Sequence, residues 1–300
     1  IPSWNSGDCI AACLTKALNQ GVESVHVVDN GSADATLDII QTQFPSVKLT
    51  SWPKNRGFAA AMNFGIAESR TEFVFLLNDD CELEKNYISI LVAELQKANE
   101  AASATGKLLS STADAPTIDS VGIRLDRYAL RPLDKGHGEL DEGQYDLDSN
   151  VFGPSAAAVL FRKAALNSLG EAPFDESLVS YYEDVDLAWR LKNANWRHHY
   201  CHRAIGFHRR RGPEEKPIEI RARAFANRYI VWAKNESFDS FVLSLFIALP
   251  WEIARLTRRY FTCREELSQV PRALNHSLGI VFKRILNSPP FDKLKELFGG

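Results

Sequence analysis

The chain has 300 residues, of which 45% are hydrophobic and 24% are charged. This length and composition exclude a disordered chain and allow one large globular domain, alone or with an appended segment. The net charge of −3 hides an asymmetry, because residues 1–196 carry 16 basic and 28 acidic side chains whereas residues 197–300 carry 19 and 10. We therefore expect a basic carboxyl-terminal region that meets an anionic partner, either a phospholipid surface or a phosphate-bearing substrate.

The five cysteines form no CxxC pair, which is typical of free thiols in a reducing compartment, so we expect a cytoplasmic protein. Every apolar run is shorter than the roughly 18 residues that a membrane-spanning helix needs. No sequence motif supports nucleic acid binding. The chain opens with IPSWN, which reads as the end of a strand, and we expect further residues upstream of Ile1.

Predicted strands and helices alternate in the first hundred residues. Residues 22–34 predict a strand and a glycine turn, with Ser32 or Asp34 capping the helix that follows. Residues 47–52 predict the next strand, and residues 54–68 predict a turn and a second helix. This alternation predicts a parallel, doubly wound α/β sheet whose functional loops share one edge.

The most informative segment is FVFLLNDDC, residues 73–81. Its apolar run predicts a strand buried on both faces, so Asn78, Asp79 and Asp80 follow at the carboxyl edge of the sheet, where open α/β folds bind ligands. Two adjacent carboxylates favour a hard cation, Mg²⁺ or Mn²⁺, that also takes oxygens from a substrate diphosphate. The alternative is a solvated loop with an acidic helix cap.

The second half of the chain adds further acidic and basic groups. Residues 110–150 predict a substrate-side loop region with a short hairpin, and residues 153–166 predict a strand that runs into a helix. A helix is predicted to open at Glu183 and Asp184, where carboxylates are stabilised by the helix dipole or, in a cleft, serve as a general base. His208 is followed by three arginines and is either a structural histidine or a further metal ligand.

Together these segments resemble the family 2 inverting glycosyltransferases with the GT-A fold. The resemblance covers residues 1 to about 212, and the segments that carry it are, in order, IPSWN, VVDNGSAD, NRGFAAAMNFGI, LLNDDC, GPSAAAVLFRKAAL and YYEDVDLAWRLKNANW. It is strongest toward bacterial rhamnosyltransferase-like members that build cell-surface polysaccharides. It implies a GT-A catalytic domain over residues 1–212, with a mainly parallel sheet and helices on both faces, followed by a helical region over residues 213–300.

The resemblance also implies roles for the residues that match the family motifs. The nucleotide part of the donor is implied to lie against Pro2, Trp4, Asn5, Asp29, Asn55, Arg56, Gly57, Asn78 and Asp79. The metal ligands are implied to be Asp80 and His208, the catalytic base Asp184, and the residues bordering the acceptor pocket Asp175 and Glu183. Asn78 stands where a strict DXD element has its first acid, so only two carboxylates remain in this element.

These roles imply the chemistry of an inverting transferase. A Mg²⁺ or Mn²⁺ ion neutralises the diphosphate leaving group of a dTDP- or UDP-sugar, possible donors that include dTDP-rhamnose. A base on the opposite side then activates a hydroxyl of a glycan or polyprenyl-linked acceptor. The enzyme is expected at the inner face of the cell membrane. A nucleotide-sugar pyrophosphorylase and a catalytically inactive sugar-binding protein are the alternatives, and the first lacks a glycine-rich loop after the first strand.

The carboxyl-terminal region is rich in aromatic side chains and arginine. The run FVLSLFIALPWEIA is too short to span a membrane and contains Pro250. Apolar and basic side chains in this mixture favour interfacial helices on an anionic leaflet, with arginines 221–228 and 255–259 and the pair 283–284 as the lipid contacts. The alternative is a helical hairpin that packs on the protein or on a second copy in a homodimer.

Overall fold

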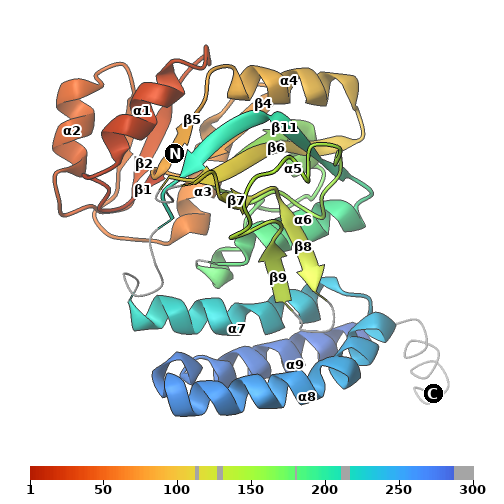
Figure 1. Ribbon diagram of the computed structural model, residues 1–300. Helices are drawn as coiled ribbons and strands as arrows, with labels where there is room; N and C mark the ends of the chain where they lie inside the picture. The colour runs from red at the N-terminus through yellow and green to blue at the C-terminus, as the bar shows by residue number, and fades with distance from the viewer. Residues whose placement is uncertain (112–114, 127–130, 180, 211–216, 287–300) are drawn as a thin grey trace, which may run out of the picture. The chain divides into compact units, whose positions relative to one another are not determined.

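The computed structural model describes residues 1–111, 115–126, 131–179, 181–210 and 217–286 (Figure 1). The chain divides into two compact units, one formed by Ile1–Arg124 with Leu133–Arg211 and the other by Leu125–Pro132 with Gly212–Gly300. The boundary expected between residues 212 and 213 lies outside the described residues. The residues implied to form the active site all belong to the first unit.

The first unit begins with a parallel three-stranded sheet in the order β1 (Pro2–Ser3), β2 (His26–Asp29) and β3 (Lys48–Ser51). The helices between and after these strands are α1 (Ile10–Leu18), α2 (Thr36–Gln43) and α3 (Phe58–Glu68). Asp34 accepts a hydrogen bond from Thr36 N at 3.1 Å, but the cap position of α2 is taken by Ala35, so the prediction of Ser32 or Asp34 as the cap was wrong. The Ser32 hydroxyl instead accepts from Asn5 N at 2.9 Å.

A larger mixed sheet follows, in the order β4 (Phe73–Leu77), β10 (Ala158–Arg162), β6 (Ala101–Ser110), β11 (Arg197–His208) and β5 (Cys81–Leu83), with β7 (Ile118–Ser120) also paired to β6. Only β6 and β11 run parallel in this sheet, as far as it is described. The hairpin predicted within residues 110–150 is β8 (Ile123–Asp126) with β9 (Arg131–Asp134).

The strand β4 has the predicted bounds but not the predicted environment. It lies at the end of its sheet, where Phe73 to Phe75 are only half-buried and Leu76 and Leu77 are buried. The expectation of a strand buried on both faces was therefore wrong for its first three residues. The carboxyl end of β4, which carries the acidic residues, is the buried end.

Helices cover both faces of the larger sheet, which confirms the α/β fold. Alternate residues of β10 face opposite sides: Leu160 packs in a core with α1 and α4 (Tyr87–Lys97), whereas Phe161 packs in a second core with α3, α5 (Lys163–Asn167) and α6 (Glu183–Asn193). A short 3₁₀ helix, η1 (Glu176–Leu178), precedes α6. This layering directs the loops after β1, β2 and β4 to one edge.

The second unit is helical, as predicted for the carboxyl-terminal region. It contains α7 (Ile218–Asn235), α8 (Phe238–Thr262), η3 (Arg264–Leu267) and α9 (Val270–Leu286) (Figure 1). Ala226 and Tyr229 of α7 pack against Val270 and Ala273 of α9. Within the described residues, no helix combines the length and the apolar character needed to cross a membrane.

Most arginines of the second unit serve its own packing. Arg228 of α7 forms a bidentate ion pair with the buried Glu252 of α8, which also binds Arg255. Three further arginines bind Glu266 or the carbonyls at the end of α7: Arg221, Arg259 and Arg284. The paired members of the expected clusters therefore connect the helices, whereas Arg258 and Lys283 of the same clusters are exposed.

Candidate active site

The residues after β4 contact the first loop of the chain. Asp79 Oδ2 accepts hydrogen bonds from Trp4 N at 3.3 Å and from the Ser6 hydroxyl. Asn78 N donates to Ala157 O at 2.8 Å, while the buried Asn78 Oδ1 has no hydrogen-bond partner among the described residues. A buried acceptor of this kind is available to a ligand, since buried polar groups are normally paired.

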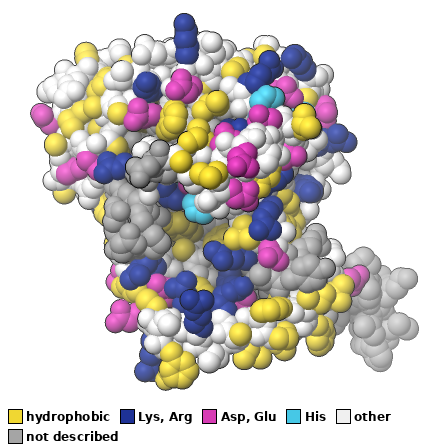
Figure 2. All heavy atoms as spheres, viewed as in Figure 1, with side chains coloured by type: hydrophobic (Ala, Val, Ile, Leu, Met, Phe, Trp, Pro, Cys, Tyr) yellow, Lys and Arg dark blue, Asp and Glu magenta, His cyan; other side chains and the backbone are white. Residues whose placement is uncertain are grey.

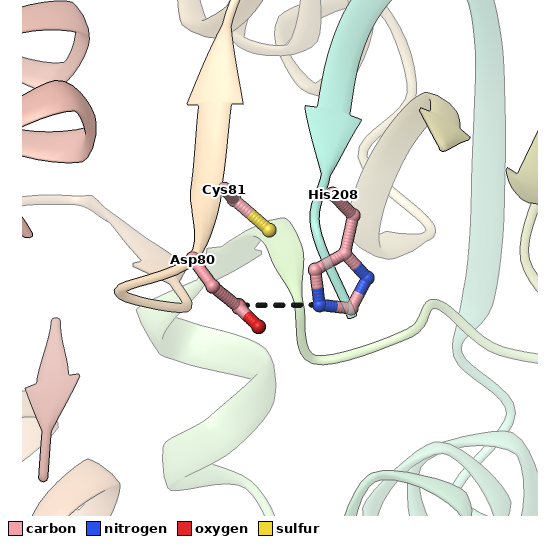
Figure 3. Close-up of side chains that lie close together, drawn as sticks. All are labelled: Asp80, Cys81 and His208. Atoms are coloured by element: carbon pink, nitrogen blue, oxygen red, sulfur yellow. Dashed lines mark ion pairs between the residues drawn. The ribbon is translucent and has the colours of Figure 1, made fainter. Parts of the chain in front are cut away.

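Asp80 and His208 come together from two different strand ends (Figure 3). Asp80 precedes β5, and His208 is the last residue of β11, where it pairs with Cys81 of β5. His208 Nε2 lies 3.2 Å from Asp80 Oδ1. These two groups and the Cys81 thiol form a cluster whose ligand atoms lie within 4.8 Å of one another.

The donor atoms of this cluster fit a hard divalent cation. A carboxylate oxygen and an imidazole nitrogen are both ligands of Mn²⁺-type ions. Burial raises the pKa of the Cys81 thiol well above its ordinary value, which keeps the sulfur protonated and makes it a poor ligand. Burial alone would lower the pKa of His208, but hydrogen bonds to Asp119 and Asp80 outweigh it and raise the pKa to about 9. Two carboxylates therefore hold a positive charge on this ring, and a divalent cation can bind Nε2 only by displacing its proton.

The loop after β2 is built around Asp29. Its Oδ2 accepts hydrogen bonds from Gly31 N and Ser32 N, both at 3.2 Å, while Oδ1 is buried without a described partner. The Asn5 side chain joins this loop to the first one, because its Oδ1 accepts from Ala33 N at 2.8 Å. Asp29 therefore has one unpaired acceptor oxygen beside the first loop. A residue that accepts a hydrogen bond from a base or a ribose needs such an oxygen.

Asn30, which the sequence did not single out, holds the loop that contains Asn55, Arg56 and Gly57. Its side chain accepts from Arg56 N at 2.7 Å and donates to Gly57 O at 3.0 Å. The Arg56 guanidinium lies 4.4 Å from the centre of the Trp52 ring. Gly57 has φ 94° and approaches so closely that an added Cβ would lie 2.9 Å from Val179 O, so only glycine fits there.

Asp184 begins α6, as predicted, and is held by two backbone amides. Its Oδ1 accepts from Val185 N at 2.8 Å and its Oδ2 from Ala156 N at 3.3 Å. Ala156 is followed by Ala157, whose carbonyl binds Asn78 N. Two consecutive residues therefore connect the proposed base with the acidic loop after β4, although the two lie more than 100 residues apart in the sequence.

The two acids at this helix start have raised pKa values. Burial, followed by the charge of Asp184, raises the pKa of Glu183 to about 8, and Glu183 Oε2 has no hydrogen-bond partner in the described structure. Burial, followed by the charge of Asp134, raises the pKa of Asp184 to about 6. Burial and mutual repulsion thus raise the pKa values of the pair, and a raised carboxyl pKa is what a general base near pH 7 requires.

Backbone strain marks the segment before α6. Val179, Tyr181 and Tyr182 all have positive φ, between 64° and 71°. Such conformations cost free energy in non-glycine residues and cluster at functional sites. Asp175 accepts a hydrogen bond from Ser177 N at 2.9 Å and so caps η1, which gives it a structural task beside the predicted acceptor contact.

Two residues outside the predicted set support His208. Asp119 of β7 binds His208 Nδ1, and Arg210 binds both Asp119 and Asp134. No local motif marks Asp119, because its contact to His208 exists only once β7 and β11 flank β6. The arginines that follow His208 in the sequence could have predicted that acidic side chains lie near it.

The described geometry brings Asp80 and His208 together at strand ends of an α/β sheet and connects Asp184 with the loop after β4. Residues 1–170 match the model of the family described as glycosyl transferase family 2. The chain belongs to glycosyl transferase family 2. This family 2 chain is 30% identical over 205 residues to the pre-mycofactocin glycosyltransferase of Mycobacterium tuberculosis, a match that covers 67% of the chain and only 40% of that relative.

A second relative is matched over most of its length. The N-acetylglucosaminyl-diphospho-decaprenol L-rhamnosyltransferase of M. tuberculosis is 24% identical over 246 residues, which cover 75% of this chain and 79% of that protein. Solved structures support the fold. Residues 1–349 of S. aureus TarS in complex with UDP-GlcNAc have a TM-score of 0.59 at 16% identity, covering 95% of this family 2 chain and 81% of that TarS fragment.

A second solved structure is a mannosyltransferase from Pyrobaculum calidifontis in complex with GDP-Man and Mn²⁺. It has a TM-score of 0.54 at 16% identity, and the match covers 99% of this chain and 77% of the mannosyltransferase chain. At such identities the likeness shows the fold, and the GT-A-like α/β fold with carboxyl-terminal helices is thereby confirmed.

Proposed function

We propose that this family 2 protein transfers a sugar from a nucleoside-diphosphate sugar to an acceptor hydroxyl. The observation that carries the proposal is the convergence of Asp80 and His208 from separate strand ends, next to Asp79 and the first loop. Mn²⁺ is named with one of the related structures and fits this donor set. When bound to Asp80 and His208, the divalent cation neutralises charge that develops on the diphosphate leaving group.

The protein's own groups bind and orient the donor. The unpaired Asp29 Oδ1 accepts from the base or ribose, and Asn78 and Asp79 lie between this nucleotide loop and Asp80. Pro2, Trp4 and Asn5 form the first loop, and the loop held by Asn30 contributes Asn55, Arg56 and Gly57. This arrangement supports a donor whose sugar extends toward α6, which carries Asp184.

Asp184 is proposed to take the proton from the acceptor hydroxyl as the oxygen attacks the anomeric carbon. The base lies opposite the leaving group, so the configuration at the anomeric carbon inverts. Its two backbone hydrogen bonds fix the carboxylate, and its raised pKa of about 6 leaves it ionised but basic at neutral pH. Protonated Glu183 donates a hydrogen bond to the acceptor, with Asp175 at the border of the same pocket.

We further propose a dTDP-sugar, in the first place dTDP-rhamnose, as the donor and a polyprenyl-linked glycan as the acceptor, with UDP-sugars as the next donors to consider. The rhamnosyltransferase relative supports this choice, since it is matched over 79% of its length. Cell-envelope polysaccharide synthesis in the cytoplasm is the setting that these substrates require.

The proposal is tested by incubating the purified full chain with dTDP-rhamnose, UDP-GlcNAc or GDP-mannose in the presence of Mn²⁺. Slow donor hydrolysis and transfer to a decaprenyl-diphosphate-linked sugar are followed by mass spectrometry. We expect release of the nucleoside diphosphate, which depends on metal and is lost in Asp80→Ala. Release of pyrophosphate from a nucleoside triphosphate and a sugar phosphate would instead establish the pyrophosphorylase alternative, and binding without turnover would establish an inactive sugar-binding protein.

The second unit is proposed to rest on the surface of the cell membrane. The buried side of α8 contains the polar Ser244 and Glu252, whereas Phe246, Trp251 and Ile253 are 74%, 65% and 57% exposed. Figure 2 shows hydrophobic side chains at the surface where the carboxyl-terminal helices lie. On α9, exposed apolar residues recur at every fourth position: Leu274, Leu278 and Phe282.

Apolar contact, more than the expected arginine clusters, would hold this surface to lipid. Aromatic and aliphatic side chains on one helix side are typical of interfacial helices. The exposed cations left for anionic headgroups include Arg258, Arg264, Arg272 and Lys283. A second copy of the chain is the alternative partner for these helices.

A further inference from the structure

The imidazole of His208 lies between two carboxylates from different elements. Its Nε2 is 3.2 Å from Asp80 Oδ1, and its Nδ1 is 2.8 Å from Asp119 Oδ2. The Asp119 side chain is 3% exposed, whereas that of Asp80 is 13% exposed. One ring nitrogen therefore has a buried partner, and the other faces the acid proposed to bind the donor's metal.

The larger sheet fixes this contact. Strand β6 pairs with β11 on one side, with Ser110 opposite His208, and with β7 on the other, with Leu109 opposite Ile118. Asp119 follows Ile118 directly. Because one strand sets the register of both neighbours, the Asp119 carboxylate and the His208 ring meet through backbone pairing and need no flexible loop.

Asp119 is itself anchored by a second positive group, the Arg210 guanidinium. Arg210 Nε lies 2.7 Å from Asp119 Oδ1, and an Arg210 terminal nitrogen lies 3.1 Å from Asp119 Oδ2. The same guanidinium binds Asp134 Oδ2 at 2.9 Å. Both carboxylate oxygens of Asp119 are thus held, which leaves the hydrogen bond to His208 little freedom to change direction.

We propose that Asp119 is a positioning residue that acts through His208. By accepting a hydrogen bond from Nδ1, it orients the ring so that Nε2 points toward Asp80 and a divalent cation. The inference rests on the proposed function, because it requires His208 to be a metal ligand. A carboxylate in this position fixes the tautomer of the histidine, and loss of such a partner typically costs about 10–100-fold in metal affinity.

The test measures Mn²⁺ affinity in the full chain, with UDP present, by electron paramagnetic resonance of the free ion. We expect Asp119→Ala to weaken Mn²⁺ binding by about 10–100-fold. Asp119→Asn keeps an oxygen acceptor for Nδ1 without the charge, so it should recover part of the loss. If Asp119→Asn recovers Mn²⁺ affinity, the acceptor oxygen is what matters, which supports positioning. If Asp119 served only packing, Mn²⁺ affinity would not depend on whether that oxygen is present.

Asp134→Asn is the matched control, because it removes the other carboxylate partner of Arg210 and leaves the contact between Asp119 and His208 intact. Its Mn²⁺ affinity should equal that of the wild type. Thermal unfolding without metal shows whether each variant is folded. If Asp119→Ala does not fold, weaker Mn²⁺ binding by Asp119→Asn supports the positioning role, and wild-type binding by Asp119→Asn contradicts it.

Three outcomes are distinguishable. Weakened binding in the Asp119 variants and in His208→Ala supports the positioning role. Wild-type affinity in both Asp119 variants, with binding lost in His208→Ala, overturns the role of Asp119 and leaves the proposed metal site in place. Wild-type affinity in His208→Ala overturns the metal site and the positioning role together.

Discussion

The ionisation of Asp184 links its environment to a measurable pH dependence. A general base acts only when deprotonated, and burial together with the charge of Asp134 raises the pKa of Asp184 to about 6. We therefore expect kcat/KM to fall about tenfold per pH unit below pH 6. Since kcat/KM reports the free enzyme, a profile that stays flat down to pH 5 would contradict this assignment.

The variant Asp134→Asn tests whether the charge of Asp134 sets the pH dependence of kcat/KM. Removing its negative charge makes ionisation of Asp184 easier, so the acidic limb should move to lower pH. Because Glu183 and Asp184 are adjacent and both buried or partly buried, the observed limb belongs to the pair rather than to one side chain. A limb that moves to higher pH would refute the electrostatic explanation.

Replacement of Asp184 tests whether this residue acts in proton transfer and not in donor binding. Asp184→Asn keeps one of the two acceptor oxygens that bind Val185 N and Ala156 N, and its neutral amide cannot take a proton. We expect transfer to fall by about two to four orders of magnitude. Calorimetry with UDP and Mn²⁺ should give unchanged donor-side affinity, and a variant that retains full turnover would exclude Asp184 as the base.

In the cluster of Asp80, Cys81 and His208, the first and last are the proposed metal ligands and Cys81 is a core side chain. Cys81 is fully buried among α1 and α4, and its raised pKa keeps the thiol protonated. Asp80→Ala should therefore abolish Mn²⁺-dependent UDP binding, whereas Cys81→Ala should leave it unchanged and lower only stability. Loss of Mn²⁺ affinity in Cys81→Ala, in folded protein, would show that the thiol is a ligand.

At the scale of elements, local sequence signals located the strands and helices near the site. The apolar run predicted β4 with its observed bounds, and Gly57 and the acids at 183 and 184 marked the starts of α3 and α6. Pairing across the sheet was not predictable in this way. The contact of Asp119 with His208, and the place of β4 at the end of its sheet, depend on which distant strands pair.

The helices of the second unit show the same limit. Composition predicted basic helices, but the partners of their arginines lie far apart in sequence: Arg228 and Glu252 are 24 residues apart. The spacing of residues along one helix shows only which side chains are neighbours on that helix. It could not show that these arginines pair with acids on other helices of the unit. The exposed apolar side of α8 likewise became evident only when its buried side was known.

The ion pair between α7 and α8 should stabilise the second unit. Arg228 and Glu252 have side chains that are 3% and 9% exposed, and removal of one partner from such a pair leaves an uncompensated charge. Arg228→Met should lower the free energy of unfolding by about 3 kcal/mol. Urea unfolding followed by circular dichroism measures it.

The double variant Arg228→Met with Glu252→Leu is the control for that measurement. It removes both charges, so much of the lost stability should return. Equal destabilisation in the single and double variants would show that stacking of the Arg228 guanidinium on the Phe225 and Tyr229 rings, and not the ion pair with Glu252, is what stabilises the helices.

At the scale of the whole molecule, the proposed lipid surface predicts how the protein divides between water and vesicles. Phe246, Trp251 and Ile253 are exposed, so replacing all three by serine removes little from the folded core. Full burial of such a side chain contributes roughly 1.5–3 kcal/mol, so the triple variant should bind vesicles at least about tenfold more weakly. Sedimentation with liposomes, at unchanged thermal stability, measures the effect.

The lipid composition tests how much of the binding is electrostatic. Because Arg228, Arg255 and Arg259 are paired within the unit, binding should persist on neutral phosphatidylcholine vesicles. The exposed cations should add roughly 1 kcal/mol each on phosphatidylglycerol, and salt should remove that increment. Arg258→Gln with Lys283→Gln should therefore lower only the binding to anionic vesicles. If the wild type binds neither vesicle and the triple serine variant changes the mass in sedimentation equilibrium, the apolar surface joins two copies of the chain instead.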